Sequence, residues 1–510
     1  EFRRVLFRSV KFMRTGSYDA KAALGLAIGG VPGVLLAAYV VKDNTVTLEL
    51  SEYAGYAGLI VANGGLAPSE DSYFFKKHGF KVSIKLSEAE SWSALNAGKL
   101  AASATTVDVL ASYGRQFQVS VPALIGYSRG ADGLVVRSDI KKINELRGKT
   151  IVTAQFTEAD FFIRYLAFEA GLEINISPTP DPQKLNLVFG DDGFAAGDYF
   201  LAHLDQYAGC VTWAPKTSEF VQKSAGKARI LTTSRNLLIV ADVLVVNKGF
   251  AQANPEKVAG LVDGLLEGNR RIRETGAGLD VVAKAFQWDA GKTRAELDKV
   301  HLANHPENLA FFTGAIDAAG SFGGIFQSAI YAYGPLIRSP ADSDSFANTK
   351  PLQAVAANYR DQKVAIAPLR TGTGPVSVEN DPLLSKNIRF LFQPNSAKLD
   401  LKNADNLRQL ETIKNLLQVS PGSMVLLRGH VDNARVEDFR KTGGEKLVRE
   451  MALKAVELSK NRALEIKNLL QERQGVDAVR LESLGRGWDE PLGPDSEQNR
   501  RVEVQWFTVE

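Results

Sequence analysis

A carboxylate and a guanidinium near the C-terminus have the types and the spacing to hold a charged ligand. Asp432 follows an apolar strand that begins at Met424, and Arg462 lies thirty residues later on a predicted helix. A carboxylate at a strand end and a guanidinium on the next helix can meet at one edge of a sheet. Together they would present a negative and a positive charge to a zwitterionic ligand, and the arginine fork can bind a carboxylate in two places.

The motifs around these two residues resemble the C-terminal domain of the OmpA-like family, which binds peptidoglycan. The family pattern is G-H-x-D after a strand, L-S-x-x-R-A on a helix, then G-x-G-x-x-x-P and N-R-R-V-E. This sequence has the matching residues in the same order: Gly429, His430 and Asp432; Leu458, Ser459, Arg462 and Ala463; Gly485, Gly487 and Pro491; Asn499, Arg500, Arg501, Val502 and Glu503. The implied domain spans residues 387–510.

This resemblance implies particular contacts with the cell wall. In the family an aspartate and an arginine bind the diaminopimelate of the stem peptide, and Asp432 and Arg462 stand at the matching positions. Further contacts are expected from other motif residues: Gly429, His430, Asn395 and Ser396. The sequence departs from the family at Ala455, where an asparagine usually precedes L-S, and in the long charged segment 435–449. A surface ion pair at a sheet edge is the alternative interpretation.

Length and composition bound the remaining possibilities. A chain of 510 residues suggests about three domains. Hydrophobic and charged contents of 45% and 23% are ordinary for a globular protein. The net charge of +3 is too small to indicate nucleic-acid binding. The single cysteine, Cys210, excludes a disulfide within the chain and a thiolate metal site.

The N-terminal segment predicts export. Residues 1–9 look like translated sequencing-adapter DNA and are set aside. No residue from 22 to 41 is charged, and this length suits a membrane-spanning helix. Residues 10–43 are therefore predicted as an uncleaved anchor in the inner membrane, with a cleaved signal ending near residues 37–39 as the alternative. In both cases the rest of the chain lies on the periplasmic side of a Gram-negative-type envelope.

Strand and helix patterns alternate through residues 44–368, which favours an α/β fold with mostly parallel sheets. The length of this region predicts two lobes. Predicted strands cover 45–50, 81–85, 134–136, 150–154 and 244–246, and predicted helices cover 54–63, 91–97, 161–170 and 255–268.

The order of short segments here is similar to a periplasmic substrate-binding protein of an ABC importer, of the nitrate, sulfonate and taurine type. The matching segments are 53–56, 76–82, 94–99, 104–108, 132–136, 143–149, 211–215 and 254–258. The resemblance implies two lobes that close on a small solute by a hinge, with an ABC permease as a further partner.

Cleft residues are expected where strands end and helices begin, because such edges line the ligand crevice of open α/β sheets. The candidates by this rule are Ser51, Glu52, Tyr53, Thr105, Thr106, Thr157, Glu158, Trp213 and Asp242. Thr157 is also expected to cap a helix, with Asp160 completing a capping-box-like pair. The acidic Glu52 argues against a purely anionic ligand, so the solute stays open.

Two patterns that could indicate catalysis or a metal have better structural explanations. Residues 126–130 fit the G-x-S-x-G hydrolase elbow, but a strand rather than a helix follows, so a hinge or strand turn is predicted. His301 and His305 stand one helical turn apart, but the sequence offers no third ligand. We therefore expect no metal, no cofactor and no enzymatic activity.

A linker at 369–386, rich in Gly, Pro and small polar residues, precedes the C-terminal domain. That domain is expected to have a β-α-β-α-β order, with a first strand at 387–392 and an amphipathic helix at 407–417. The sequence thus predicts an exported, membrane-anchored solute-binding protein that also binds peptidoglycan. Two alternatives stay open: a structural or sensory envelope protein whose middle domain binds no solute, and an enzyme built on the same fold.

Overall fold

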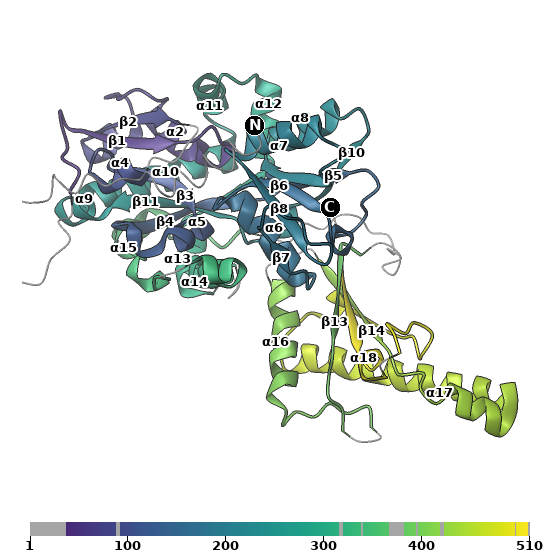
Figure 1. The fold of residues 1–510 in the computed structure, drawn as a ribbon. Coiled ribbons are helices and arrows are strands. Elements are labelled where there is room, and N and C mark those ends of the chain that lie inside the picture. Colours follow the sequence, from purple (N-terminus) through teal and green to yellow (C-terminus); the bar gives the residue numbers. More distant parts are fainter. Residues whose placement is uncertain are drawn as a thin grey trace, which may run out of the picture. The chain divides into compact units, whose positions relative to one another are not determined.

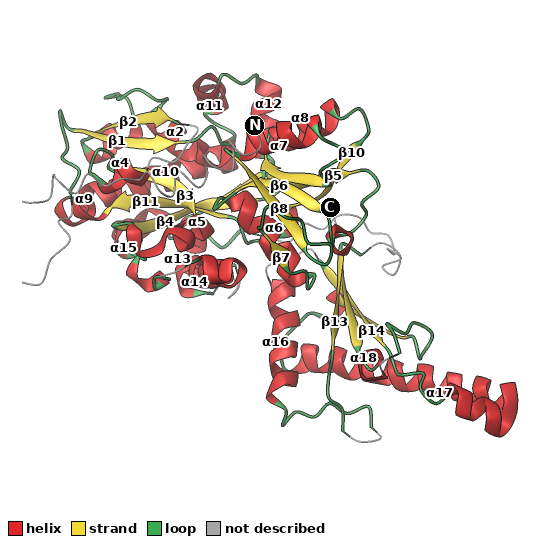
Figure 2. Cartoon of the chain, viewed as in Figure 1, coloured by secondary structure: helices red, strands yellow, loops and turns green. Residues whose placement is uncertain are grey.

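The computed structural model describes residues 37–87, 92–315, 320–337, 340–366, 382–393, 396–418, 423–494 and 496–507. Three β-sheets organise these residues: one for each lobe of the α/β region and one for the C-terminal domain (Figures 1 and 2). The predicted fold class, a two-lobed α/β domain followed by a small α+β domain, is confirmed.

The first lobe is built on a six-stranded sheet in the order β12-β4-β11-β3-β1-β2. The strands are β1 (Thr45–Leu50), β2 (Lys81–Leu86), β3 (Ala102–Thr106), β4 (Val119–Ser128), β11 (Ala241–Asn247) and β12 (Val300–Leu302). Its main helices are η1 (Ala54–Tyr56), α2 (Ala57–Asn63), α3 (Tyr73–His78), α4 (Trp92–Asn96), α5 (Val107–Tyr113), α9 (Lys248–Ala253), α10 (Pro255–Thr275), α11 (Leu279–Phe286), α12 (Ala290–Leu297), α13 (His305–Thr313), α14 (Phe322–Tyr333) and α15 (Lys350–Val355). Every residue of β4 and β11 is buried, as expected for central strands covered on both faces.

The second lobe has a six-stranded sheet in the order β10-β5-β9-β6-β8-β7. Its strands are β5 (Asp132–Arg137), β6 (Thr150–Ala154), β7 (Ile174–Asn175), β8 (Leu185–Gly190), β9 (Gly209–Trp213) and β10 (Ala228–Thr233). Helices η3 (Ile143–Leu146), α6 (Glu158–Glu169), α7 (Gly193–Ala202) and α8 (Lys216–Lys223) complete it.

Both lobe sheets are mixed. Among the described residues, three of the five strand pairs in the second lobe are parallel, as predicted, but three of the five pairs in the first lobe are antiparallel, so the prediction of mostly parallel sheets is wrong there. Strand β11 runs antiparallel to β3 and β4, and β5 runs antiparallel to β9 and β10. The reason lies in the two places where the chain passes between lobes, at residues 129–131 and 234–240. At each crossing the chain enters the new sheet from the hinge, where the neighbouring strands β9 and β3 end, so β5 and β11 run opposite to those neighbours.

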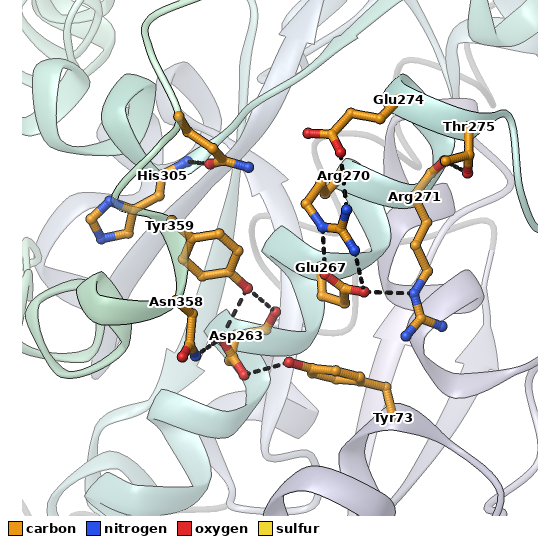
Figure 3. A network of polar contacts seen from close by, with 11 residues as sticks. Tyr73, Asp263, Glu267, Arg270, Arg271, Glu274, Thr275, His305, Asn358 and Tyr359 are labelled. Carbon is orange, nitrogen blue, oxygen red and sulfur yellow. Dashed lines mark hydrogen bonds and ion pairs between the residues drawn. The ribbon is translucent and has the colours of Figure 1, made fainter.

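A buried carboxylate on α10 holds several elements of the first lobe together (Figure 3). Asp263 is fully buried and accepts hydrogen bonds from the Tyr73 hydroxyl at 2.8 Å, and from the Asn358 amide and the Tyr359 hydroxyl at 2.9 Å. The His78 ring lies 2.8 Å from its second oxygen. Burial alone would raise the pKa of Asp263, but these four side chains outweigh it and lower the pKa to about 2.

The end of the predicted membrane segment belongs to the folded unit. Tyr39 is buried, its backbone N–H donates to Asn247 Oδ1 at 3.3 Å, and its hydroxyl donates to the Thr45 carbonyl at 3.1 Å. A membrane span within residues 22–41 would therefore have to end before Tyr39, and residues 22–36 lie outside the described residues. Within the described ranges, no helix is long and apolar enough to span a membrane.

The C-terminal sheet has four strands in the order β13-β16-β14-β15. They are β13 (Leu384–Ile388), β14 (Met424–Gly429), β15 (Leu481–Gly485) and β16 (Val502–Phe507), with helices α16 (Ala404–Gln418), α17 (Val436–Glu472) and α18 (Ser496–Asn499). The first strand was expected at 387–392 and lies earlier. Phe392 instead forms an isolated bridge with Leu399 and so belongs to a turn.

Candidate functional site

Close packing of α17 on the sheet sets the geometry of the charged edge predicted from the sequence. A Cβ atom at Gly429 would lie 2.1 Å from the Ser459 carbonyl oxygen. A Cβ atom at Gly485 would lie 2.4 Å from the Val456 carbonyl oxygen. Only glycine lets the helix backbone approach the strands this closely. The Ser459 hydroxyl also accepts a backbone N–H from the loop after β15 at 2.9 Å. The motif glycines and serine therefore fix the helix that carries Arg462.

At this edge Asp432 is bound by a second arginine that was not among the predicted contacts. The Arg500 Nε–H donates to Asp432 Oδ2 at 2.6 Å, and the two side chains are 52% and 18% exposed. The Arg462 guanidinium lies over the Phe392 ring at 4.8 Å, and its Nε–H has no hydrogen-bond partner among the described residues. Burial and the Arg500 charge lower the pKa of Arg462, and the Asp432 charge opposes them.

Two guanidinium groups around one carboxylate leave this edge with an excess of positive charge. An ammonium group can bind Asp432, while a carboxylate can bind Arg462 or Arg500 through paired N–H donors. The Phe392 ring supplies an apolar platform beneath Arg462. The arrangement is therefore suited to a zwitterionic group.

A charge network behind the edge anchors β16, the strand that follows Arg500. Arg428 donates to Glu503 at 2.5 Å and to both oxygens of Glu490 at 2.7 and 2.8 Å. Burial alone would raise the pKa of Glu503, but the nearby His430 ring, a hydrogen bond from Gln505 at 3.0 Å and the Arg428 charge lower it to about 2. His430, Glu490 and Glu503 are close enough to resemble a metal site. Because Arg428 already binds both carboxylates, the group is a salt-bridge network instead.

The structure assigns different roles to the other residues predicted here. Gly429 acts through packing, and His430 is only 2% exposed, with Nε2 3.5 Å from Glu503. Ser396 accepts a backbone N–H from Lys398 within the turn that begins at Phe392. The predicted contact Asn395 lies outside the described residues.

Arg500 and Phe392 are the contacts that sequence reasoning missed. Both stand inside motifs that the sequence displays, N-R-R-V-E and the turn after the first strand. Arg500 lies in the turn before β16, and its direction there is set by the folded chain.

The two departures from the family pattern leave this edge intact. Ala455 is buried on α17. The charged segment forms the start of the same helix, which contains one non-helical residue, Gly444. Phe439 stacks on Trp488 with ring centroids 6.2 Å apart, and this contact ties the segment to the loop after β15.

The second candidate site is the region where the chain crosses between the lobes, which we call the cleft floor because the sequence predicts a ligand cleft at these strand ends. Ser128 ends β4, and its hydroxyl lies 2.6 Å from the Ser234 hydroxyl of the other crossing. The Ser234 oxygen also accepts the backbone N–H groups of Gly130 and Asp132, at 3.0 and 3.2 Å. The two crossings are thus joined by hydrogen bonds, as expected for a hinge. This confirms that G-x-S-x-G is a strand turn here, with Ser128 fully buried.

Each crossing delivers an aspartate to the floor. Asp132 opens β5 of the second lobe and Asp242 is the second residue of β11 of the first lobe; each is 3% exposed. Asp242 accepts the Tyr56 hydroxyl at 3.0 Å and pairs across the sheet with Thr106. Asp132 pairs across its own sheet with Trp213.

The pKa of the Tyr53 hydroxyl is affected by charged groups from both lobes. Its ring lies 5.2 Å from that of Tyr56. Burial raises the pKa of the Tyr53 hydroxyl well above its usual value, and the charges of Asp242, Asp132 and Glu158 raise it further. Burial also raises the pKa of Asp132 to about 6, because its charged form is poorly solvated. The structure therefore brings together the predicted residues Tyr53, Asp242 and Glu158, from both lobes.

Other predicted cleft residues have structural partners of their own. Glu52 is exposed and accepts the Trp288 indole N–H at 2.6 Å, and Ser51 contributes its carbonyl to a turn with Tyr53. Trp213 packs on the start of α7, with its ring 4.9 Å from that of Phe194. Thr105 and Thr106 are buried, and their hydroxyls have no hydrogen-bond partner in the described residues.

The expected capping box at α6 is wrong in its bonding. Thr157 is at the N-cap, but its hydroxyl donates to the Ala154 carbonyl at 2.7 Å. Asp160 accepts the backbone N–H of Phe156 and the Nε–H of Arg164 instead. Phe156 has a φ of +60°, rare for a bulky residue, and this conformation aims its N–H at Asp160.

Asp132 was missed as a site residue although the sequence holds a signal for it. The segments 132–136 and 242–246 read D-G-L-V-V and D-V-L-V-V. A carboxylate that opens a fully apolar strand is costly to bury, which is a reason to suspect a site. His301 and His305 do not converge, because His301 lies 3.0 Å from Glu307 and His305 Nε2 lies 2.9 Å from the Leu352 carbonyl oxygen.

Comparison with known families agrees with the resemblance of the C-terminal domain. Residues 391–505 match the OmpA family. No curated protein matches the chain. Among solved structures, the periplasmic aliphatic sulphonate binding protein SsuA from Escherichia coli is 14% identical with a TM-score of 0.45, over 60% of this chain and 97% of that one.

Two further structures are similar to a comparable degree. The alkanesulfonate-binding protein SsuA from Xanthomonas axonopodis pv. citri, solved with MOPS, is 13% identical with a TM-score of 0.45, over 61% of this chain and 99% of that one. The desulfurization enzyme DszB is 15% identical with a TM-score of 0.41, over 62% and 99%.

Proposed function

We propose that this chain is an exported solute-binding protein that also binds peptidoglycan non-covalently, and that it acts without catalysing a reaction. The single observation that carries the wall-binding half is the edge formed by Asp432, Arg462 and Arg500. Its charges suit the ammonium and carboxylate of a diaminopimelate side chain in the stem peptide. The match of residues 391–505 to the OmpA family supports the same assignment.

Retention on purified peptidoglycan tests this half of the proposal. The variants Asp432→Ala and Arg462→Ala should each lose retention in a sedimentation assay, because each removes one charge of the zwitterion site. Arg449→Ala is the matched control, since Arg449 is an exposed arginine on the same helix. Unchanged retention in both site variants would sink the assignment.

The solute-binding half rests on the hinge geometry. The crossings are joined through Ser128 and Ser234, and buried polar groups from both lobes converge above them. A protein of this kind would deliver its solute to an ABC permease. Burial of Ser128 argues against a serine nucleophile, which supports a binding role over an enzymatic one.

An N-terminal anchor within the predicted segment 10–43, ending before the buried Tyr39, and the wall-binding domain would together hold the chain at the periplasmic face of the inner membrane. A thermal-shift screen of the full chain against small solutes tests the solute-binding half. Stabilisation by a solute supports it. Absence of any stabilisation would favour the alternative, a structural or sensory envelope protein, and product formation would favour an enzyme.

A further inference from the structure

The cleft floor carries a distinctive charge pattern. One buried aspartate enters from each lobe, Asp132 and Asp242, and Glu158 lies close enough for its charge to act on Tyr53 beside them. One oxygen of the Asp132 carboxylate is buried without a hydrogen-bond partner among the described residues. An ionised carboxylate in such a place is costly unless a positive charge pairs with it.

The buried arginine of this region, Arg164, is balanced by Asp160 through Nε only, because its Nη2 has no hydrogen-bond partner among the described residues. Arg164 on α6 donates from Nε to Asp160 at 2.7 Å, and both side chains are almost fully buried. Its guanidinium also lies over the Tyr333 ring at 5.1 Å. At the crossings, Arg129 directs its Nε–H to the Arg235 carbonyl oxygen at 2.9 Å. These contacts leave the Asp132 charge for a ligand.

The floor also offers groups that suit an organic cation more than a metal ion. Tyr53 and Tyr56 form an edge-to-face pair beside Asp242, and aromatic faces attract ammonium groups. The buried Thr105 and Thr106 hydroxyls can accept N–H donors of a ligand. Among the described residues, the side chains grouped closely enough to hold a metal are His430, Glu490 and Glu503 of the C-terminal domain. In the described part of the chain, the floor carboxylates do not form such a group.

We infer that the cleft takes a small organic cation, with an amine or amidine group held between Asp132 of one lobe and Asp242 of the other. This inference rests on the proposed solute-binding function and names its substrate class. It differs from the sulfonate named for the similar solved structures. A cation bound to both aspartates would contact both lobes at the hinge, so ligand charge and lobe closure are coupled.

Calorimetry and thermal shift on the full chain test the inference with defined probes. Choline, putrescine and agmatine represent organic cations, and ethanesulfonate, taurine and nitrate represent the anionic and sulfonate class. We expect at least one cation to raise the melting temperature. Asp132→Asn should then weaken its Kd about tenfold or more, the loss typical of removing a charged partner. Asp205→Asn, an exposed aspartate of the same lobe, is the matched control and should leave Kd unchanged.

Asp242→Asn gives a second variant if Asp132→Asn fails to fold, because an asparagine oxygen can still accept the Tyr56 hydroxyl. If only sulfonates or nitrate bind, the inference is overturned but the solute-binding function stands. Arg164 would then be the candidate for binding the anion. Cation binding that survives both aspartate variants would also overturn it. Stabilisation by neither class of probe would overturn the inference, and only a broader negative screen would remove the solute-binding function itself.

Discussion

Replacing Gly429 by alanine should damage the wall-binding domain and its site together. The added Cβ would lie 2.1 Å from the Ser459 carbonyl oxygen, and ordinary contacts of this kind begin at about 3.4 Å. Helix α17 and strand β14 would have to separate by roughly 1 Å. Overpacking of this size costs about 1–3 kcal/mol. The displaced helix carries Arg462, so its distance from Asp432 would change as well.

Hydrogen exchange followed by mass spectrometry isolates this effect from the other domains. Amides of β14 and of the second half of α17 should exchange faster in Gly429→Ala by a factor that corresponds to about 1–3 kcal/mol. Retention on peptidoglycan should fall in the same variant. Gly493→Ala is the control, because a Cβ there meets no atom within 4 Å. Unchanged exchange and full retention in Gly429→Ala would refute the packing argument.

Two further predictions follow from pKa directions. Burial raises the pKa of Asp132 to about 6, so cation binding should strengthen as pH rises through 6 and the carboxylate ionises; calorimetry at several pH values should find this dependence in the native chain and lose it in Asp132→Asn. The pKa of Asp263 is lowered to about 2, against about 3.9 in an unfolded chain. Its contribution, on the order of 2 kcal/mol, should therefore be present above about pH 4 and lost as pH falls toward 2. Exchange of α10 amides should show that loss in the native chain, and an equal acid response in Asp263→Asn would contradict it.

Local signals in the sequence predicted much of the secondary structure. Strands 45–50 and 150–154 have the predicted bounds, because alternating or continuous apolar residues stand between clear turn residues. Helix α10 begins at Pro255 as expected. Strand direction was not predictable in this way, since it depends on which lobe the chain enters after residue 128 and after residue 233. That choice is made by contacts between residues far apart in sequence.

In the candidate sites too, local sequence signals predicted some residues, and others depend on contacts between distant parts of the chain. Asp432 and Arg462 were found because their motifs fix a strand end and a helix face. The Asp432–Arg500 bond was not found, because it joins the segments that flank β14 and β16, and only the folded sheet defines the register of these two strands. At the cleft, Tyr53 and Asp242 followed from the rule on strand ends. Asp132 was missed because its segment, 132–136, was used only to recognise the fold.

The Asp432–Arg500 bond has a consequence for how the wall could be recognised. An ammonium group that binds Asp432 competes with the Arg500 guanidinium for the same carboxylate. Arg500, once released, needs an anion of its own. A ligand with an amine alone would leave the Arg500 charge unpaired, whereas a ligand with an amine and a carboxylate pairs with both Asp432 and Arg500. We therefore expect this edge to bind ligands that carry both an amine and a carboxylate more tightly than simple polyamines.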